Sequence, residues 1–174
     1  LNSYLCKTCN YLNYTVLRSM ITIEKIARLR EQMKRLNLAA FIIPSSDPHL
    51  SEYVAPHWKS REWLSGFTGS AGILVITSHK AGLWTDSRYY IQAEKQIQGS
   101  GIELHKEGLP ATPTIPEYLI RELQPNEIAG IDGSLFAVNA VRSMQTTLGK
   151  YGIKLQTNDG PFKERWKGRP GAPT

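Results

Sequence analysis

The sequence predicts an α/β fold in which helices flank a mixed β-sheet, and three observations support this prediction. Short apolar runs alternate with segments of helical periodicity along most of the chain. The run at 39–44 is apolar throughout, which is typical of a strand buried on both faces of a sheet. Only three residues separate the runs at 73–77 and 81–85, so these two predict an antiparallel hairpin within the sheet.

The first predicted helix begins at Thr22, whose hydroxyl can cap it, and Glu24 follows in the first turn. Apolar residues then recur at alternating three- and four-residue spacing as far as Leu36, and Asn37 ends the helix. This spacing gives one apolar stripe, so we expect the helix to cover one face of the sheet. Pro44 ends the strand that follows, and the hairpin comes next.

After the hairpin, strands and helices continue to alternate. Asp86 is expected to cap a helix over 87–98. Pro116 suits the first turn of a helix, Gly152 suits a helix end, and Trp166 is expected to anchor the end of the fold. The remaining predicted elements are a strand at 102–105, a helix at 116–123, a strand at 127–131, a helix at 136–151 and a strand at 153–156.

The composition predicts one globular domain with a short extension at each end. The chain has 174 residues, of which 41% are hydrophobic and 21% are charged. Residues 1–19 lack helical periodicity, and we expect them to be a poorly ordered extension that precedes the natural start of the protein at Met20. The domain then covers 20–166, and the segment 167–174, rich in Pro and Gly, is expected to begin a linker.

Charge and hydropathy predict neither a nucleic-acid nor a membrane partner. The net charge is +6, but the basic residues are scattered. Arg28, Arg30, Lys34 and Arg35 come nearest to a cluster, and their helical spacing favours a solvated helix face. No apolar run approaches the roughly 18 residues that a membrane span needs.

Cysteine and histidine patterns do not predict a metal site. Cys6 and Cys9 supply two thiolates, whereas a structural zinc site uses four ligands. His49, Glu52 and His57 lie within nine positions, but a catalytic metal needs ligands that converge on one point, and the HExxH motif is absent. The low cysteine count fits a reducing compartment, and we expect a cytoplasmic protein.

The glycines at 66, 69 and 72 are interpreted as structural. A phosphate loop lies between a strand and a helix, because the helix N-terminus helps to hold the phosphate, but these glycines precede a strand. Ser65 is not part of a GxSxG nucleophile elbow. The sequence therefore predicts no catalytic residue.

Five aromatic and charged residues are the candidates for a contact surface. They are Arg61, Trp63, Asp86, Arg88 and Tyr89. Arginine can hold a carboxylate or a peptide carbonyl in a defined geometry, and tyrosine and tryptophan are enriched at interfaces. A local ion pair between Asp86 and Arg88, without any contact to a partner, is the other interpretation.

Four segments together resemble a known family. They are FIIPSSDPHLSEYVAP at 41–56, REWLSGFTGSAGILVIT at 61–77, AGLWTDSRYYIQAEKQI at 81–97 and ERWKGRP at 164–170. In this order and spacing they resemble the N-terminal domain of the creatinase/prolidase family, in particular its Xaa-Pro aminopeptidase (aminopeptidase P) branch. The resemblance covers 23–170 and implies a ribonuclease-H-like mixed sheet, without implying nuclease activity.

The resemblance also implies a function. In the family, a C-terminal domain holds two divalent metal ions, often manganese, through two Asp, one His and two Glu, and a metal-bridging hydroxide attacks the bond before proline. None of these ligands can be assigned to this chain. The resemblance therefore implies a non-catalytic N-terminal domain that serves assembly and restricts substrate access.

Partners follow from the same resemblance. They are the protein's own C-terminal catalytic domain, a second subunit in a homodimer, and peptide substrates with proline at the second position. Arg88, oriented by Asp86, is expected to lie near the substrate of the neighbouring subunit. A stand-alone binding module with the same fold and no peptidase activity is the alternative.

Overall fold

The computed structural model describes residues 3–158 and 166–172, with side chains for 15–157 and 166–172. Its centre is a six-stranded sheet in the order β4-β3-β2-β1-β5-β6. The strands are β1 (Ala40–Ile43), β2 (Ile73–Thr77), β3 (Ala81–Thr85), β4 (Glu103–Lys106), β5 (Ile128–Asp132) and β6 (Lys154–Asn158). β2 is antiparallel to β1 and β3, and the other neighbours are parallel, so the prediction of a mixed sheet is confirmed.

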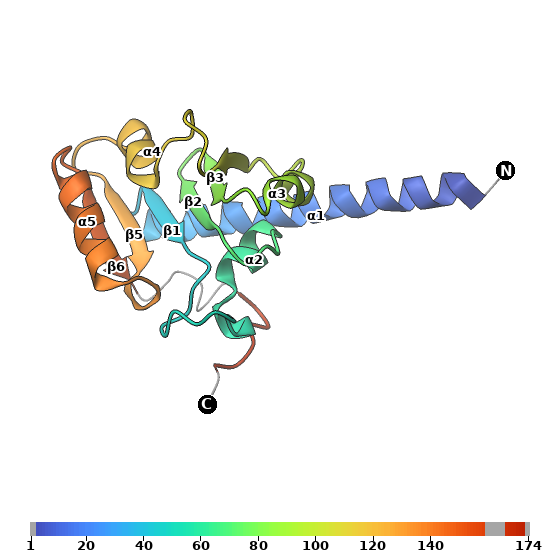
Figure 1. Cartoon of the computed structure of the whole chain (residues 1–174), viewed down its shortest axis with the longest axis horizontal. Helices are drawn as coiled ribbons and strands as arrows, with labels where there is room; N and C mark the ends of the chain where they lie inside the picture. The colour runs from blue at the N-terminus through green and yellow to red at the C-terminus, as the bar shows by residue number, and fades with distance from the viewer. Residues whose placement is uncertain (1–2, 159–165, 173–174) are drawn as a thin grey trace.

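Helices cover both faces of the sheet (Figure 1). One face carries α1 (Ser3–Arg35), α2 (Ser60–Ser65) and α3 (Tyr90–Ile97), and the other carries α4 (Ile115–Glu122) and α5 (Val138–Gly149). Two short 3₁₀ helices are η1 (Pro56–Trp58) and η2 (Gly133–Leu135). This layered arrangement buries both faces of the sheet, as expected for a sheet with parallel strands.

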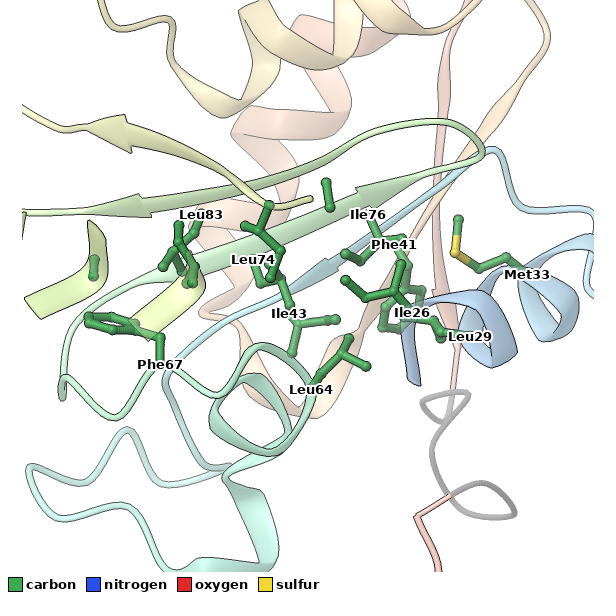
Figure 2. Close-up of a cluster of buried hydrophobic side chains, with 14 of the residues drawn as sticks. Ile26, Leu29, Met33, Phe41, Ile43, Leu64, Phe67, Leu74, Ile76 and Leu83 are labelled. Carbon is green, nitrogen blue, oxygen red and sulfur yellow. The ribbon is translucent and has the colours of Figure 1, made fainter. Parts of the chain in front are cut away.

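The central strand β1 divides the core into two halves. All four of its residues are buried, as its apolar sequence predicts. Phe41 and Ile43 pack under α1, α2 and α3, whereas Ala40 and Ile42 pack under α4 and α5. Figure 2 shows the first half, where the side chains of α1 meet those of the sheet.

The start of α1 differs from the prediction. We expected the helix to begin at Thr22, but Thr22 lies inside α1 and is buried. Residues 3–19, expected to be poorly ordered, are helical. No Gly or Pro occurs between residues 3 and 35, so nothing interrupts the backbone hydrogen bonds. Apolar periodicity is missing from 3–19 because α1 extends past the sheet there (Figure 1), and the start at Met20 stays a prediction.

The start of α3 also differs from the prediction. Asp86 does not cap this helix, which begins only at Tyr90. Its carboxylate instead accepts a hydrogen bond from the backbone N–H of Arg88 at 3.0 Å, and its carbonyl accepts one from Tyr89 at 3.0 Å. These bonds make a tight turn between β3 and α3.

The later elements lie close to their predicted positions. β4, β5 and β6 are shifted by one or two residues, and α4 begins with Pro116 in its first turn as expected. α5 begins two residues late, because the side chain of Asp132 accepts a hydrogen bond from Ser134 N at 3.1 Å and starts η2. Gly152 adopts φ +72° just after α5, which confirms it as the residue that ends the helix.

Candidate functional site

Arg61 is a buried cation that holds the glycine loop between α2 and β2. The residue is only 4% exposed, and its guanidinium donates to Phe67 O at 2.8 Å and to Gly69 O. It also lies over the ring of Phe67, 4.7 Å from the centroid. Desolvation lowers the pKa of Arg61 to about 10, so the side chain stays charged at neutral pH. In this position Arg61 supports the loop and does not project from the surface.

The glycine loop packs too closely for side chains. A Cβ on Gly69 would lie 2.3 Å from Cζ of Phe67 and 2.9 Å from Cδ1 of Tyr89. Gly66 has φ +72°, in the left-handed region that favours glycine. The loop leads into β2, and its glycines allow close approach of the backbone to Phe67 and Tyr89. This supports the structural interpretation of these glycines.

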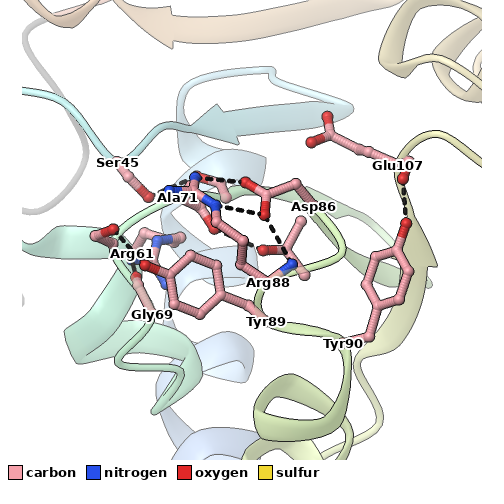
Figure 3. A network of polar contacts seen from close by, with 12 residues as sticks. Ser45, Arg61, Gly69, Ala71, Asp86, Arg88, Tyr89, Tyr90 and Glu107 are labelled. Carbon is pink, nitrogen blue, oxygen red and sulfur yellow. Dashed lines mark hydrogen bonds and ion pairs between the residues drawn. The ribbon is translucent and has the colours of Figure 1, made fainter.

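Arg88 is an exposed cation held by a two-point ion pair. Its Nε donates to Asp86 Oδ1 at 2.9 Å and a terminal nitrogen donates to Asp86 Oδ2 at 2.7 Å (Figure 3). The Arg88 side chain is 66% exposed and that of Asp86 is 34% exposed. Hydrogen bonds from Arg88 lower the pKa of Asp86, and the same pairing raises the pKa of Arg88. The pair therefore stays charged and keeps the guanidinium in one direction.

Tyr89 connects this ion pair to the glycine loop. Its hydroxyl is 2.7 Å from Ser70 Oγ, and its ring meets that of Phe67 edge-on with centroids 6.0 Å apart. The hydrogen bond with Ser70 lowers the pKa of the Tyr89 phenol. The guanidinium of Arg88 lies over the Tyr89 ring, 5.2 Å from its centroid. The structure thus brings Asp86, Arg88 and Tyr89 together, and the Phe67 ring lies against both Tyr89 and Arg61.

A small pocket lies beside this group. It has a volume of about 200 Å³ and lies between the end of β1, the segment before η1 and the glycine loop. Its lining includes Ser45, Tyr53, Trp58, Arg61 and Ser70. Tyr53 is 85% exposed at its rim, and Ser45 Oγ donates to Gly72 O at 2.6 Å. The pocket is large enough for about one side chain of a bound peptide.

Trp63, the fifth predicted site residue, lies apart from this group. Its ring stacks on Trp166 with centroids 5.1 Å apart and planes 18° apart, which confirms Trp166 as an anchor. Arg169 Nε donates to His57 O at 2.9 Å, and His57 Nδ1 donates to Pro170 O at 2.7 Å. We expected a linker from residue 167, but the segment binds the domain as far as Pro170, because His57 and the tryptophans hold it.

The histidines do not form a metal site within the described residues. No three His, Cys, Asp or Glu side chains in that part of the chain are grouped closely enough to hold a metal ion. His57 Nδ1 binds Pro170 O, and the backbone N–H of His49 donates to the buried Asp47. Hydrogen bonds, first that from Ser51, lower the pKa of Asp47, so this carboxylate acts as the acceptor of a turn.

A buried aromatic cluster was not predicted. It consists of His105, Trp84 and Tyr118, from β4, β3 and α4. Within the described chain His105 Nε2 and the Tyr118 hydroxyl have no hydrogen-bond partner. Burial lowers the pKa of His105 and raises the pKa of Tyr118 to about 12. Only the pairing of β3 with β4 places His105 opposite Trp84, and no local pattern signals it.

Comparison with known proteins assigns the family. The model of the Creatinase/Prolidase N-terminal domain matches residues 25–161. The chain belongs to this family. The four segments that resemble a creatinase/prolidase N-terminal domain therefore identified it correctly.

Longer proteins carry similar creatinase/prolidase domains. Probable Xaa-Pro aminopeptidase P of Laccaria bicolor is 42% identical over 141 residues, which are 81% of this chain and 22% of that protein. Xaa-Pro aminopeptidase 2 of Rattus norvegicus is 46% identical over 119 residues, which are 68% of this chain and 17% of that protein. The chain thus spans about a fifth of the length of these relatives.

Solved structures share the fold of this creatinase/prolidase domain. X-prolyl aminopeptidase of Caenorhabditis elegans, described as a cytosolic enzyme with a di-nuclear active site, matches with a TM-score of 0.82 and 33% identity. The match covers 87% of this chain and 26% of that one. The N-terminal domain of the cytoplasmic peptidase PepQ from Mycobacterium tuberculosis matches with a TM-score of 0.58 and 22% identity over 81% of this chain and 97% of its own, which shows the fold. Within the described residues, no helix is long and apolar enough to cross a membrane.

Proposed function

We propose that the chain is the non-catalytic N-terminal domain of an Xaa-Pro aminopeptidase, an enzyme that removes the first residue from peptides with proline in second place. One observation carries this proposal. The C. elegans X-prolyl aminopeptidase matches 87% of this chain at a TM-score of 0.82, while the match uses only 26% of that enzyme. Most of such an enzyme therefore lies outside this domain, and in this proposal that part is catalytic.

Metal chemistry belongs, in this proposal, to the catalytic part. The described residues here do not group into a set of three metal ligands, and the His57 side chain binds the Pro170 carbonyl. Two divalent ions, with manganese as the expected metal, would supply the attacking hydroxide in the catalytic domain. A cytoplasmic location and a homodimer are parts of the same proposal, and the cytosolic C. elegans relative supports the first.

Arg88 is the residue that we assign to assembly and substrate access. Asp86 occupies its Nε and one terminal nitrogen, and the second terminal nitrogen has no hydrogen bond to any described residue. Its remaining donors can bind a carbonyl or carboxylate of a neighbouring subunit or of a peptide. Because Asp86 keeps the guanidinium in one direction, little side-chain freedom is lost on binding.

Two assays test the proposal. The purified chain with added manganese is expected to leave an Xaa-Pro peptide intact, and hydrolysis by this chain would contradict its non-catalytic status. In a longer native gene product, Arg88→Ala should change kcat or KM for the same peptide, whereas Arg121→Ala on α4 should leave both unchanged. Unchanged kinetics in Arg88→Ala would remove the role of Arg88 without affecting the family assignment.

The alternative is a stand-alone binding module with this fold. The two readings differ in the mass of the native gene product and in its activity. A native product of this length without Xaa-Pro hydrolysis would favour the binding module. A longer, hydrolytically active product would favour the aminopeptidase domain.

A further inference from the structure

A groove of about 590 Å³ runs between α1, α2 and the C-terminal segment. We call it the α1–α2 groove. Leu17 and Ile21 line it from α1, Trp63 from α2, and Trp166 and Pro170 from the C-terminal segment. Figure 1 shows the C-terminal segment beside α2, consistent with the stacking of Trp63 on Trp166. The groove does not include Asp86, Arg88 or Tyr89, although Lys59, Glu62 and Thr68 line both the groove and the small pocket described above.

Part of the wall of this groove is apolar and exposed. Leu17 is 58% exposed and Ile21 is 44% exposed, one helical turn apart on α1. The rings of Trp63 and Trp166, which stack on each other, also line the groove. Exposed apolar side chains gathered around a groove mark a surface that binds another molecule.

The groove also carries cations without matching acids. Arg18 donates to Gly66 O, and Lys25 Nζ donates to Trp63 O at 2.7 Å. Neither has a carboxylate within ion-pair distance in the described part of the chain. Glu62 is the acidic residue of the lining, and it pairs with Lys59 at 3.4 Å. Desolvation lowers the pKa of Lys25, as expected for a partly buried cation.

We propose that the α1–α2 groove binds an acidic amphipathic polypeptide segment from outside this chain. An apolar side chain of that segment packs on Leu17 and the stacked tryptophans, and its carboxylates meet Arg18 and Lys25. Charge complementarity decides the choice of partner. Among the described residues, Arg18 and Lys25 contact backbone carbonyls and Lys25 also lies over the Trp63 ring, but neither cation pairs with a carboxylate. The inference goes beyond the role of an aminopeptidase domain and does not depend on it.

The C-terminal segment forms one wall of this groove. The guanidinium of Arg169 lies 5.5 Å from the ring centroids of both Trp58 and Trp166, and its Nε binds His57 O. These contacts hold Trp166 and Pro170 in the wall of the groove. Arg169 itself does not line the groove, so it supports the site without touching the ligand.

Fluorescence anisotropy with labelled peptides tests the proposal. The probe is a short fluorescein-labelled peptide of alternating Glu and Leu, and the two comparison peptides alternate Lys with Leu and Glu with Ser. We expect saturable binding of the Glu/Leu peptide, weaker at high salt, and at least about tenfold weaker binding of both comparison peptides. Equal binding of the Glu/Leu and Lys/Leu peptides would overturn the proposal.

Matched variants locate the binding. Lys25→Gln is expected to weaken it about fivefold, whereas Arg28→Gln, the same loss of charge on the same helix, leaves it unchanged because Arg28 pairs with Glu24 outside the groove. Leu17→Ser is expected to weaken binding by a similar factor, and Val138→Ser, at an exposed position of α5, to leave it unchanged. Equal losses within either pair would contradict the proposal.

Arg169→Gln tests the dependence on the C-terminal segment. We expect it to weaken binding at least as much as Lys25→Gln, while the circular dichroism spectrum stays that of the folded domain. Binding that survives this variant would separate the site from the C-terminal segment and overturn that part of the inference.

Sedimentation experiments distinguish a second copy of the chain from an acidic partner. We expect Leu17→Ser to leave the sedimentation coefficient unchanged. A dimer that Leu17→Ser dissociates, together with no peptide binding, would assign the groove to self-association. Single-stranded DNA that displaces the probe equally well from the wild type and from Leu17→Ser would show that the surface recognises charge alone. Either result would overturn the proposal.

Discussion

The imidazole of His105 lies flat against the indole of Trp84, with ring centroids 4.0 Å apart and planes 13° apart. The two residues are register partners in the parallel strands β3 and β4. Tyr118 closes the cluster from α4, with its ring centroid 4.9 Å from that of Trp84. A titratable group is thus packed inside the apolar half of the core that α4 covers.

This packing predicts that the domain loses stability in mild acid. Burial lowers the pKa of His105 from its ordinary value of 6.5, and the carboxylate of Glu103, 3.7 Å from Nε2, opposes the shift only in part. At His105 the unfolded chain therefore binds a proton more readily than the folded chain does. The free energy of unfolding has its full value above pH 6.5 and decreases as the pH falls below 6.5. Urea unfolding measured on both sides of this pH checks the prediction.

His105→Phe is the control for this titration. It keeps an aromatic ring against Trp84 and removes the ionisable group. We expect the free energy of unfolding of this variant to change less between neutral and mildly acidic pH than that of the wild type. An identical pH dependence in both proteins would assign the titration to another residue.

Gly69→Ala is expected to destabilise the domain by about 1–3 kcal/mol, as overpacking of a dense core does. The new Cβ would lie 2.3 Å from Cζ of Phe67, and Phe67 is fully buried and has little room to move. Gly149→Ala is the matched control, because no atom lies within 4 Å of a Cβ there. Gly149 is the last residue of α5, and Gly149→Ala should leave the stability unchanged or raise it slightly. Thermal unfolding of the two variants measures the change in stability that each causes. The two changes should have opposite signs, or that of Gly69→Ala should be several-fold larger.

Removing the Arg61 side chain should loosen the glycine loop. Arg61→Ala leaves the carbonyls of Phe67 and Gly69 without their donor, and we expect the free energy of unfolding to fall by on the order of 3 kcal/mol. Arg61→Lys should recover less than half of this loss, because an ammonium cannot donate to both carbonyls in the fork geometry of a guanidinium. Full recovery by lysine would show that charge, not geometry, matters at this position.

The start of α4 offers a test of local capping. Thr114 Oγ1 accepts a hydrogen bond from Glu117 N at 3.4 Å, and the Glu117 carboxylate accepts one from Thr114 N at 2.8 Å. Thr114→Ala should therefore destabilise the domain by about 1 kcal/mol. Thr146→Ala, at an exposed site within α5, is the comparison and should change stability by less than about 0.5 kcal/mol. Chemical denaturation of both variants measures the two values.

Local patterns were sufficient to predict the sheet. The apolar run of β1, and the two runs of β2 and β3 separated by a three-residue turn, predict strands because burial and short turns leave a mark within a few residues. The group of Asp86, Arg88 and Tyr89 was equally readable, because the three residues are neighbours in sequence. Arg61 could be named, but not its burial, which depends on a loop that folds back over it.

Contacts between distant residues could not be predicted in the same way. His57 and Pro170 lie 113 positions apart, and neither residue signals the other in the sequence. The early start of α1 was missed for a different reason. Helical periodicity reports which side of a helix is covered, and the part of α1 before Thr22 extends past the sheet.

The attachment of the C-terminal segment determines how the domain bears mechanical load. β6 is an edge strand, and the sheet order places it beside β5 alone. A pull applied beyond Pro170 first reaches His57, Arg169 and the stacked tryptophans, which are tied to η1 and α2. We therefore expect a pull on the C-terminal segment to act first on η1 and α2, before it acts on the edge of the sheet.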